Sequence, residues 1–316
     1  MPVIDHSSAV PVPPADQEKW KALHRIEDTG GDTGIVARAL QTYPFERLLY
    51  AEGDSWFDKF TPLPMSGTDL LSAIRLPAFA GVVDVSHIGD MSREMVSGWQ
   101  RRQTRAMFDL FDFDAILLSA GGNDLKNVFA SLFHEMADQR RRPATANMVP
   151  ELAALARGTV DNAPFERVME DIRAFIVLRD GADRERTRRA PLFLHGYDHL
   201  QPRNAPARLF AGSRIGSGPW IYPALHDAEL GAAAMLETAR RVIDQLNEHL
   251  RRMVASLPTD ANVWLLDQRG LLTLAKPGST GASGDWMDEI HPTSAGFTKL
   301  AQQRWNPWLA QTLGLL

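Results

Sequence analysis

The chain has 316 residues, a net charge of −5 and a sequence pI near 6.0, with 44% hydrophobic and 23% charged residues. This composition is typical of a globular protein and too apolar for a disordered one. The absence of cysteine excludes disulfide scaffolds, thiol nucleophiles, cysteine-ligated zinc and iron–sulfur clusters. The mild acidity argues against partners such as nucleic acid or an acidic membrane surface. A hydrolase of this composition would use an oxygen nucleophile or an activated water.

The N-terminal segment 1–16 contains acidic residues and four prolines but no basic region followed by an apolar one. It therefore does not have the pattern of a signal peptide. No stretch approaches the roughly 18 consecutive apolar residues that a membrane span requires. We expect a cytoplasmic protein without a membrane span.

Five short apolar runs rich in Val, Ile and Leu recur along the chain, and each ends in small or polar residues. They lie at 47–52, 81–85, 114–119, 191–195 and 262–267. Their length and composition are typical of strands buried on both faces of a parallel sheet. The sequence therefore predicts a central layer built from these five runs.

Helical patterns alternate with these runs, at 68–75, 91–108, 164–178, 226–257 and 294–313. Ser294 is expected to cap the last helix, and Asp161 or Asn162 the helix that follows them. Strand and helix alternating in this way predict an α/β fold, doubly wound, with a flavodoxin-like sheet of about five parallel strands flanked by helices.

The expected organisation is an N-terminal arm with a short helix over 1–45, followed by a single catalytic domain over 46–316. Two long segments, 125–161 and 200–224, do not fit the alternation and are interpreted as insertions that flank or cover the site. Their aromatic residues are candidates for substrate contact: Phe129, Phe133, Phe210, Trp220 and Tyr222.

Polar and small residues follow each apolar run. They are Gly53-Asp54-Ser55-Trp56, Ser86-His87-Ile88-Gly89-Asp90, Gly121-Gly122-Asn123-Asp124, His195-Gly196-Tyr197-Asp198-His199 and, after a loop, Asp288-Glu289-Ile290-His291-Pro292. Ligands of open parallel sheets bind outside the carboxyl ends of the strands. Taken singly, Ser55 or Asn123 could be a helix cap. Their common position and chain order favour a functional site.

Four of these blocks resemble, in the same order, those of the GDSL-type or SGNH hydrolase family: the Gly-Asp-Ser block, the Gly89-Asp90 pair, the Gly-Gly-Asn-Asp block and the Asp-Glu-Ile-His-Pro block. The resemblance extends from about residue 46 to 300. Two positions depart from the family pattern. Trp56 stands where leucine is usual, and the asparagine that often precedes the glycine of the second block is missing before Gly89.

The resemblance implies a serine esterase with Ser55, His291 and Asp288 as a catalytic triad. Ester hydrolysis requires a base that removes the proton of the attacking hydroxyl and a carboxylate that orients this base. Backbone N–H groups of Ser55 and Gly89 and the side-chain amide of Asn123 would form the oxyanion hole. The implied substrate is a small-molecule ester: a small acyl ester, an acetylated sugar or a lipid-like ester.

Further side chains at the strand ends are candidates for substrate contact: Trp56, His87, His195, Asp198 and His199. Asp54 and Asp124 are expected to hold the turns that carry Ser55 and Asn123. No P-loop, dinucleotide fingerprint or His-Glu-x-x-His motif occurs, so we expect no cofactor and no metal.

Alternatives stay open from the sequence alone. Asp54, Asn123 and His291, together with the histidines after the fourth run, would also suit a metal-dependent phosphoesterase. An acyltransferase on the same scaffold would pass the acyl group to an alcohol or sugar instead of water. A binding module that retains these residues without catalysis is a third possibility.

Overall fold

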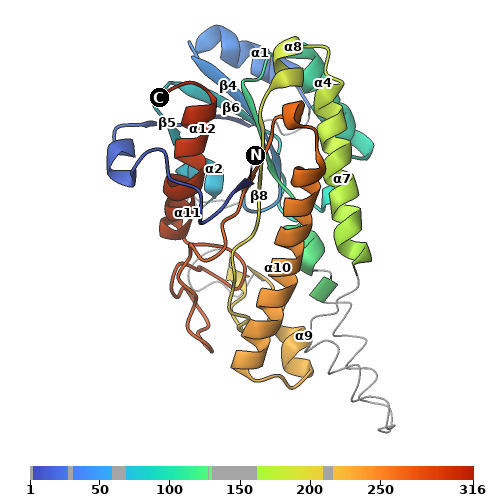
Figure 1. Ribbon diagram of the computed structural model, residues 1–316, viewed down its shortest axis with the longest axis vertical. Helices are drawn as coiled ribbons and strands as arrows, with labels where there is room; N and C mark the ends of the chain where they lie inside the picture. The colour runs from blue at the N-terminus through green and yellow to red at the C-terminus, as the bar shows by residue number, and fades with distance from the viewer. Residues whose placement is uncertain (1–2, 28–30, 59–68, 127, 130–161, 209–215) are drawn as a thin grey trace.

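The computed structural model describes residues 3–27, 31–58, 69–126, 128–129, 162–208 and 216–316. Its centre is a sheet of seven strands in the order β1-β11-β8-β7-β4-β6-β3. Figure 1 shows this sheet with helices packed around it. Most of the expected insertion at 125–161, with Phe133, lies outside the described residues. So does the part of the second insertion at 209–215, with Phe210.

The five predicted runs form the five inner strands: β4 (Arg47–Gly53), β6 (Ala80–Asp84), β7 (Ala115–Ser119), β8 (Leu192–His195) and β11 (Val263–Leu266). All neighbours in the sheet pair in parallel. The chain passes from β4 to β6 on one side and then returns to β7 on the other side of β4. This reversal confirms the predicted doubly wound, flavodoxin-like α/β fold.

The sheet has two strands more than the sequence predicted, and both come from the first 27 residues. β1 (Val3–Ile4) pairs with β11, and β3 (His24–Glu27) pairs with β6. These strands have two and four residues, too few to show an apolar run. The N-terminal segment therefore contributes the two edge strands as well as the expected short helix, α1 (Thr33–Thr42).

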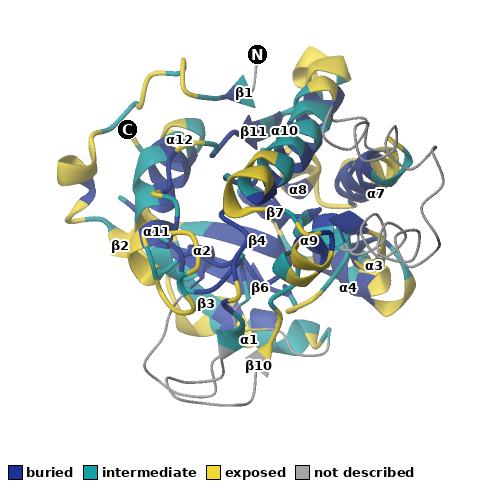
Figure 2. Ribbon diagram, turned by 90° about the horizontal axis from the view of Figure 1, so that it is seen from below, coloured by how far each residue is buried: buried dark blue, intermediate teal, exposed yellow. Residues whose placement is uncertain are grey.

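Helices cover both faces of the sheet (Figure 2). One layer contains α3 (Ser92–Met95), α4 (Gly98–Leu110), α7 (Ala163–Asp180) and α10 (Ala232–Ser256). The other contains α2 (Leu70–Ala73), α11 (Ser294–Leu300) and α12 (Asn306–Thr312), the last two joined by the π-helical turn η3 (Ala301–Trp305). None of the helices in the described ranges is both long enough and apolar enough to cross a lipid bilayer.

Smaller elements complete the described chain: η1 (Pro14–Gln17), β2 (Lys21–Ala22), β5 (Arg75–Leu76), α8 (Glu185–Arg189), β9 (Ala207–Arg208), β10 (Gly216–Ser217), α9 (Tyr222–Asp227) and η2 (Thr259–Ala261). β2 pairs with β5 and β9 with β10, both antiparallel.

Two details of the helix ends differ from the expectation. The last helical region begins at a cap formed by Thr293, not Ser294, because the Thr293 hydroxyl accepts the Gly296 N–H at 3.1 Å. Asn162 is the cap residue of α7, but its side chain makes no capping hydrogen bond. Its Oδ1 accepts instead from the Gln245 side chain at 2.8 Å.

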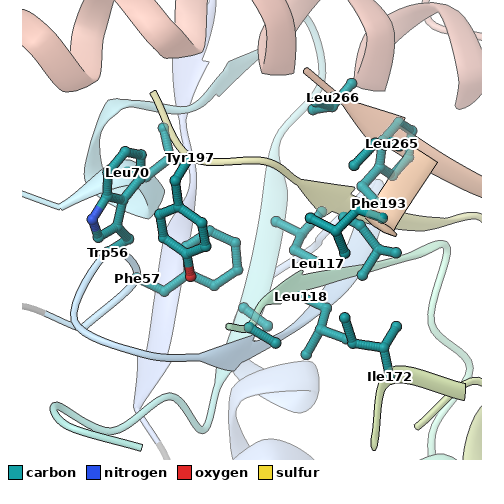
Figure 3. Packing of buried hydrophobic residues seen from close by; sticks show 14 of the residues in the cluster. Trp56, Phe57, Leu70, Leu117, Leu118, Ile172, Phe193, Tyr197, Leu265 and Leu266 are labelled. Atoms are coloured by element: carbon teal, nitrogen blue, oxygen red, sulfur yellow. The ribbon is translucent and has the colours of Figure 1, made fainter. Parts of the chain in front are cut away.

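The core runs continuously from the middle of the sheet to the carboxyl ends of its strands (Figure 3). Leu117 and Phe193 are fully buried on neighbouring strands. Beyond the strand ends, Trp56, Phe57 and Tyr197 are also buried and belong to the same cluster. The segments that carry the candidate site residues thus rest on the hydrophobic core.

Truncation of Leu117 to alanine should lower the free energy of unfolding by about 3 kcal/mol, since it removes buried methyl groups and leaves a cavity. The matched control is Val177→Ala on α7, where the side chain is 66% exposed. It should change stability by less than about 0.5 kcal/mol. Urea unfolding of both variants checks this. Equal losses would contradict the assignment of Leu117 to the core.

Candidate active site

The candidate site lies where the strand order reverses, between the carboxyl ends of β4 and β7. Gly53 and Ser119 are the last residues paired between these strands. A Cβ atom on Gly53 would lie 2.6 Å from the Ser119 Cβ, so this close approach requires glycine. Ser55 follows β4 and Asn123 follows β7, and both line one pocket. Such a reversal is the usual ligand site of a doubly wound sheet.

The turn that carries Ser55 is held by the carboxylate of Asp54. Asp54 Oδ1 accepts the Trp56 N–H at 3.0 Å and the Ser119 hydroxyl at 2.8 Å. Asp54 Oδ2 accepts the Tyr197 hydroxyl at 2.7 Å. These contacts are those of a turn-supporting residue, the role that the sequence suggested for Asp54.

The structure brings Ser55, His291 and Asp288 into one hydrogen-bonded series. Ser55 Oγ lies 2.8 Å from His291 Nε2. His291 Nδ1 lies 2.9 Å from each carboxylate oxygen of Asp288, whose Oδ1 also accepts the His291 backbone N–H at 2.8 Å. All three residues are buried. With Nδ1 protonated toward Asp288, Nε2 is free to accept the hydroxyl proton of Ser55.

Asn123 is oriented by its neighbours. Its Nδ2 donates to the carbonyl of Asp90 at 2.9 Å, and its Oδ1 accepts from Lys126 Nζ at 3.3 Å. Gly89 lies one residue before Asp90 in an exposed turn with φ of +91°, a conformation that favours glycine. Ser55 and Asn123 line the same pocket, whereas Gly89 is not among the described residues that line it.

Asp124 has a different partner from the one expected. Its carboxylate accepts the Ser92 backbone N–H at 3.0 Å, so it holds the start of α3. Asp124 therefore ties the segment after β7 to this helix, and Asn123 is held by Asp90 and Lys126.

The pocket beside Ser55 is narrow and mainly apolar, with a volume of about 40 Å³. Its walls come from the turn at 54–56, the segment after β7, the segments around 200 and 221, α10 and the loop before α11. The apolar lining residues are Trp56, Leu125, Phe129, Leu200, Ile221, Ile243, Trp286 and Ile290.

Trp56 and His195 form part of the support beneath the site. Their rings stack at 5.3 Å between centroids, and Trp56 also meets Tyr197 edge-on at 5.0 Å. His195 is 1% exposed, and its Nε2 lies 2.8 Å from the Ser119 hydroxyl. Burial lowers the pKa of His195. Of these two candidates for substrate contact, Trp56 lines the pocket and His195 packs behind it.

The other candidates for substrate contact are engaged with protein groups. Asp198 lines the pocket, but its carboxylate accepts backbone N–H groups of Gly270 and Leu272. His199 Nε2 lies 2.9 Å from Asp244 Oδ1, in a separate surface groove. His87 is half-buried, and its ring meets that of Trp99 edge-on.

Among the described residues, one group has the spacing of metal ligands. It consists of Glu52, His87 and Asp90, whose ligand atoms lie within 4.8 Å of one another. Burial and the charge of Asp90 raise the pKa of Glu52 well above its ordinary value. A protonated carboxyl is a poor metal ligand. Asp54, Asn123 and His291, which the metal-dependent alternative would use, are not in this group. Both carboxylate oxygens of Asp54 already accept hydrogen bonds from other protein groups.

Sequence reasoning missed Arg25, a residue of the edge strand β3. Its guanidinium contacts Asp84 at 2.6 Å, Asp69 at 3.0 Å and the carbonyl of Phe57. It therefore joins the end of β6 to the turn that follows Ser55. A strand of four residues with the sequence His-Arg-Ile-Glu gives no pattern that would have indicated this role.

Two further buried ionisable residues, Arg203 and Glu289, lie beside the Asp288–His291 loop. Arg203 is fully buried, and its Nη2 donates to the Asp288 carbonyl at 2.6 Å. Glu289 is 1% exposed, and burial raises its pKa to about 7. Glu289 stands between Asp288 and His291 in the sequence, but this position alone indicated no role for its side chain.

The raised pKa of Glu289 predicts that its ionisation destabilises the protein. From pH 4.5 to about 7, the folded chain keeps a proton on Glu289 that the unfolded chain loses, so stability falls as pH rises. The full penalty, on the order of 3 kcal/mol, is reached above about pH 7. Glutamine does not ionise, so the difference in free energy of unfolding between Glu289→Gln and wild type should change by this amount in favour of the variant across the interval. Urea unfolding from about pH 5 to about pH 8 measures it, and a constant difference would refute it.

Comparisons with known proteins give matches among solved structures. No family model matches the chain, and no curated protein matches it. A carbohydrate acetylesterase family member from Sinorhizobium meliloti is 12% identical, with TM-score 0.45, covering 85% of this chain and 99% of the other. The lipase Lip_vut3 from a goat rumen metagenome is 13% identical, with TM-score 0.47, covering 81% and 95%.

A protein from Slackia heliotrinireducens, provisionally assigned as an SGNH hydrolase, is 15% identical, with TM-score 0.38, covering 85% of this chain and 99% of the other. With identities of 12%, 13% and 15% and TM-scores of 0.45, 0.47 and 0.38, these likenesses assign no function to this chain.

Proposed function

We propose that this chain is a serine esterase that hydrolyses a carboxylic ester of a small molecule through an acyl-enzyme intermediate. The observation that carries the proposal is the continuous series from Ser55 Oγ through His291 to the carboxylate of Asp288, with contacts of 2.8 and 2.9 Å. The series begins at Ser55, beside the carboxyl ends of β4 and β7, where ligands of this fold bind. Its spacing is that of a nucleophile, a base and an orienting carboxylate.

In the first half of the reaction, His291 accepts the proton of Ser55 while Oγ attacks the ester carbonyl carbon. Asp288 stabilises the imidazolium that forms. His291 then returns the proton to the departing alcohol, leaving the acyl group on Ser55. In the second half, His291 takes a proton from water, which attacks the acyl carbon. The carboxylic acid leaves, and Ser55 regains its proton.

The negative oxygen of each tetrahedral intermediate requires hydrogen-bond donors. The Asn123 side-chain amide carries two hydrogens, and one donates to the Asp90 carbonyl. The other is assigned to the oxyanion, together with the backbone N–H groups of Ser55 and Gly89. The Asp90 contact supports this assignment because it fixes the amide plane before substrate binds.

The narrow apolar pocket favours a short, uncharged acyl group. A cavity of about 40 Å³ accommodates a chain of few carbons, and its apolar walls offer little to a charged one. The proposed substrates are therefore esters of short carboxylic acids, with the alcohol part directed away from this pocket.

Replacement of Ser55 or His291 by alanine should lower kcat on p-nitrophenyl acetate by at least about 10⁴-fold, because each removes a reacting group. Exposed Ser7 offers the matched control, and Ser7→Ala should keep the wild-type rate. A fluorophosphonate should label wild type but not Ser55→Ala. High residual activity in Ser55→Ala, or loss of wild-type activity with EDTA, would contradict the proposal.

Asn123→Ala should lower kcat by about 10²–10³-fold with a small change in KM, since the lost hydrogen bond forms mainly in the transition state. Steady-state kinetics on the same ester measures the split. Asn162→Ala, on the exposed end of α7, is the control. An unchanged kcat in Asn123→Ala would remove this residue from the oxyanion hole.

A further inference from the structure

Two buried ionisable side chains tie the Asp288–His291 loop to the segment 200–224. They act in opposite directions. Arg203, from that segment, donates to the carbonyls of Asp288 at 2.6 Å and Ser279 at 3.2 Å. Glu289, from the catalytic loop, accepts N–H groups of the segment. Each side chain therefore hydrogen-bonds to the main chain of the other segment.

Glu289 holds three consecutive residues at the start of α9. Its carboxylate accepts the backbone N–H groups of Trp220 at 2.5 Å, Ile221 at 2.9 Å and Tyr222 at 2.6 Å. The side chain is 1% exposed, so water does not compete for these donors. When Glu289 is ionised, these hydrogen bonds are charge-assisted and stronger than neutral ones, and they fix the donors in space.

The residues so held face the reacting groups. The Trp220 ring meets the His291 ring edge-on, with centroids 5.5 Å apart. Ile221 is 4% exposed and lines the pocket that contains Ser55. A single carboxylate thus connects the loop that carries the base to the wall that meets the acyl group.

The placement of Glu289 is costly, which argues that it has a use. Burial raises its pKa to about 7, so ionisation at neutral pH opposes folding. An apolar residue of similar size would avoid this cost but could not accept three N–H groups. Strain or polar burial that is retained beside a catalytic centre is commonly tied to its geometry.

We propose that Glu289 is a positioning residue that fixes Ile221 in the wall of the acyl pocket and Trp220 against His291, and so restricts the substrate to esters of short acids. The inference rests on the proposed esterase function and adds its substrate class. Glu289 acts through the wall and takes no part in the proton transfers. Loosening the wall should therefore change which ester is preferred more than it changes the reactivity of Ser55.

The test compares kcat/KM for p-nitrophenyl acetate and p-nitrophenyl butanoate. Wild type should prefer acetate. Glu289→Gln and Ile221→Ala should each shift this preference toward butanoate by about tenfold, the range of a change of pocket volume by one or two methylenes. Glu289→Gln combined with Ile221→Ala should shift it no further than the larger single change, because both act on one wall. Glu237→Gln, exposed on α10, is the matched control.

Fluorophosphonate labelling distinguishes the possible failures. If the variants are labelled as fast as wild type but keep its acetate preference, or lose rate equally on both esters, the positioning role is overturned. If wild type itself is neither labelled nor active, the proposed function fails. Hydrogen exchange of wild type gives a readout that does not depend on folding of the variants. The amides of residues 220–222 should be protected, and rapid exchange there would overturn the inference.

Discussion

The site depends on one buried carboxylate, that of Asp54, which joins the ends of three neighbouring strands. Asp54 follows β4, its partner Ser119 ends β7, and its partner Tyr197 follows β8. The same carboxylate holds the Trp56 N–H and so shapes the turn on which Ser55 stands. A carboxylate buried at this depth must keep its donors, because an unpaired buried charge is far more costly than a paired one. The position of Ser55 is thus fixed to the sheet by these hydrogen bonds as well as by the covalent chain.

Long apolar runs could be predicted because burial on both faces leaves a continuous pattern, as in Ala-Ile-Leu-Leu-Ser of β7. β1 and β3 could not, since two or four residues carry no pattern and their partners lie far along the chain. The pattern at 294–313 predicted one helix, but a π-helical turn at Ala301–Trp305 interrupts it. Periodicity scarcely distinguishes 3.6 residues per turn from a single wider turn.

The sequence indicated which residues lie close together where one rule applies to several of them. Ser55 and Asn123 follow neighbouring strands, so the topology alone brings them to one pocket. The same rule placed His199 there, but its ring turns to Asp244 on the surface. Arg25 could not be predicted because its partners Asp69 and Asp84 are distant in sequence. Arg203 and Glu289 could not be predicted because they bind main-chain carbonyls and amides distant in sequence. Main-chain carbonyls and amides occur in every residue, so no sequence motif indicates these contacts.

The two edge strands have a consequence for the order in which the chain can assemble. Val3 pairs with Leu265, so this edge forms after almost the whole chain is available. β3, by contrast, pairs with β6 within the first hundred residues. During synthesis, β1 cannot pair until β11 has been made, and contacts of such long range form slowly. An unpaired strand edge is a template for other chains. Docking of β1 is therefore the step that covers the edge of β11 at Leu265 and Leu266, and it needs residues from both ends of the described chain.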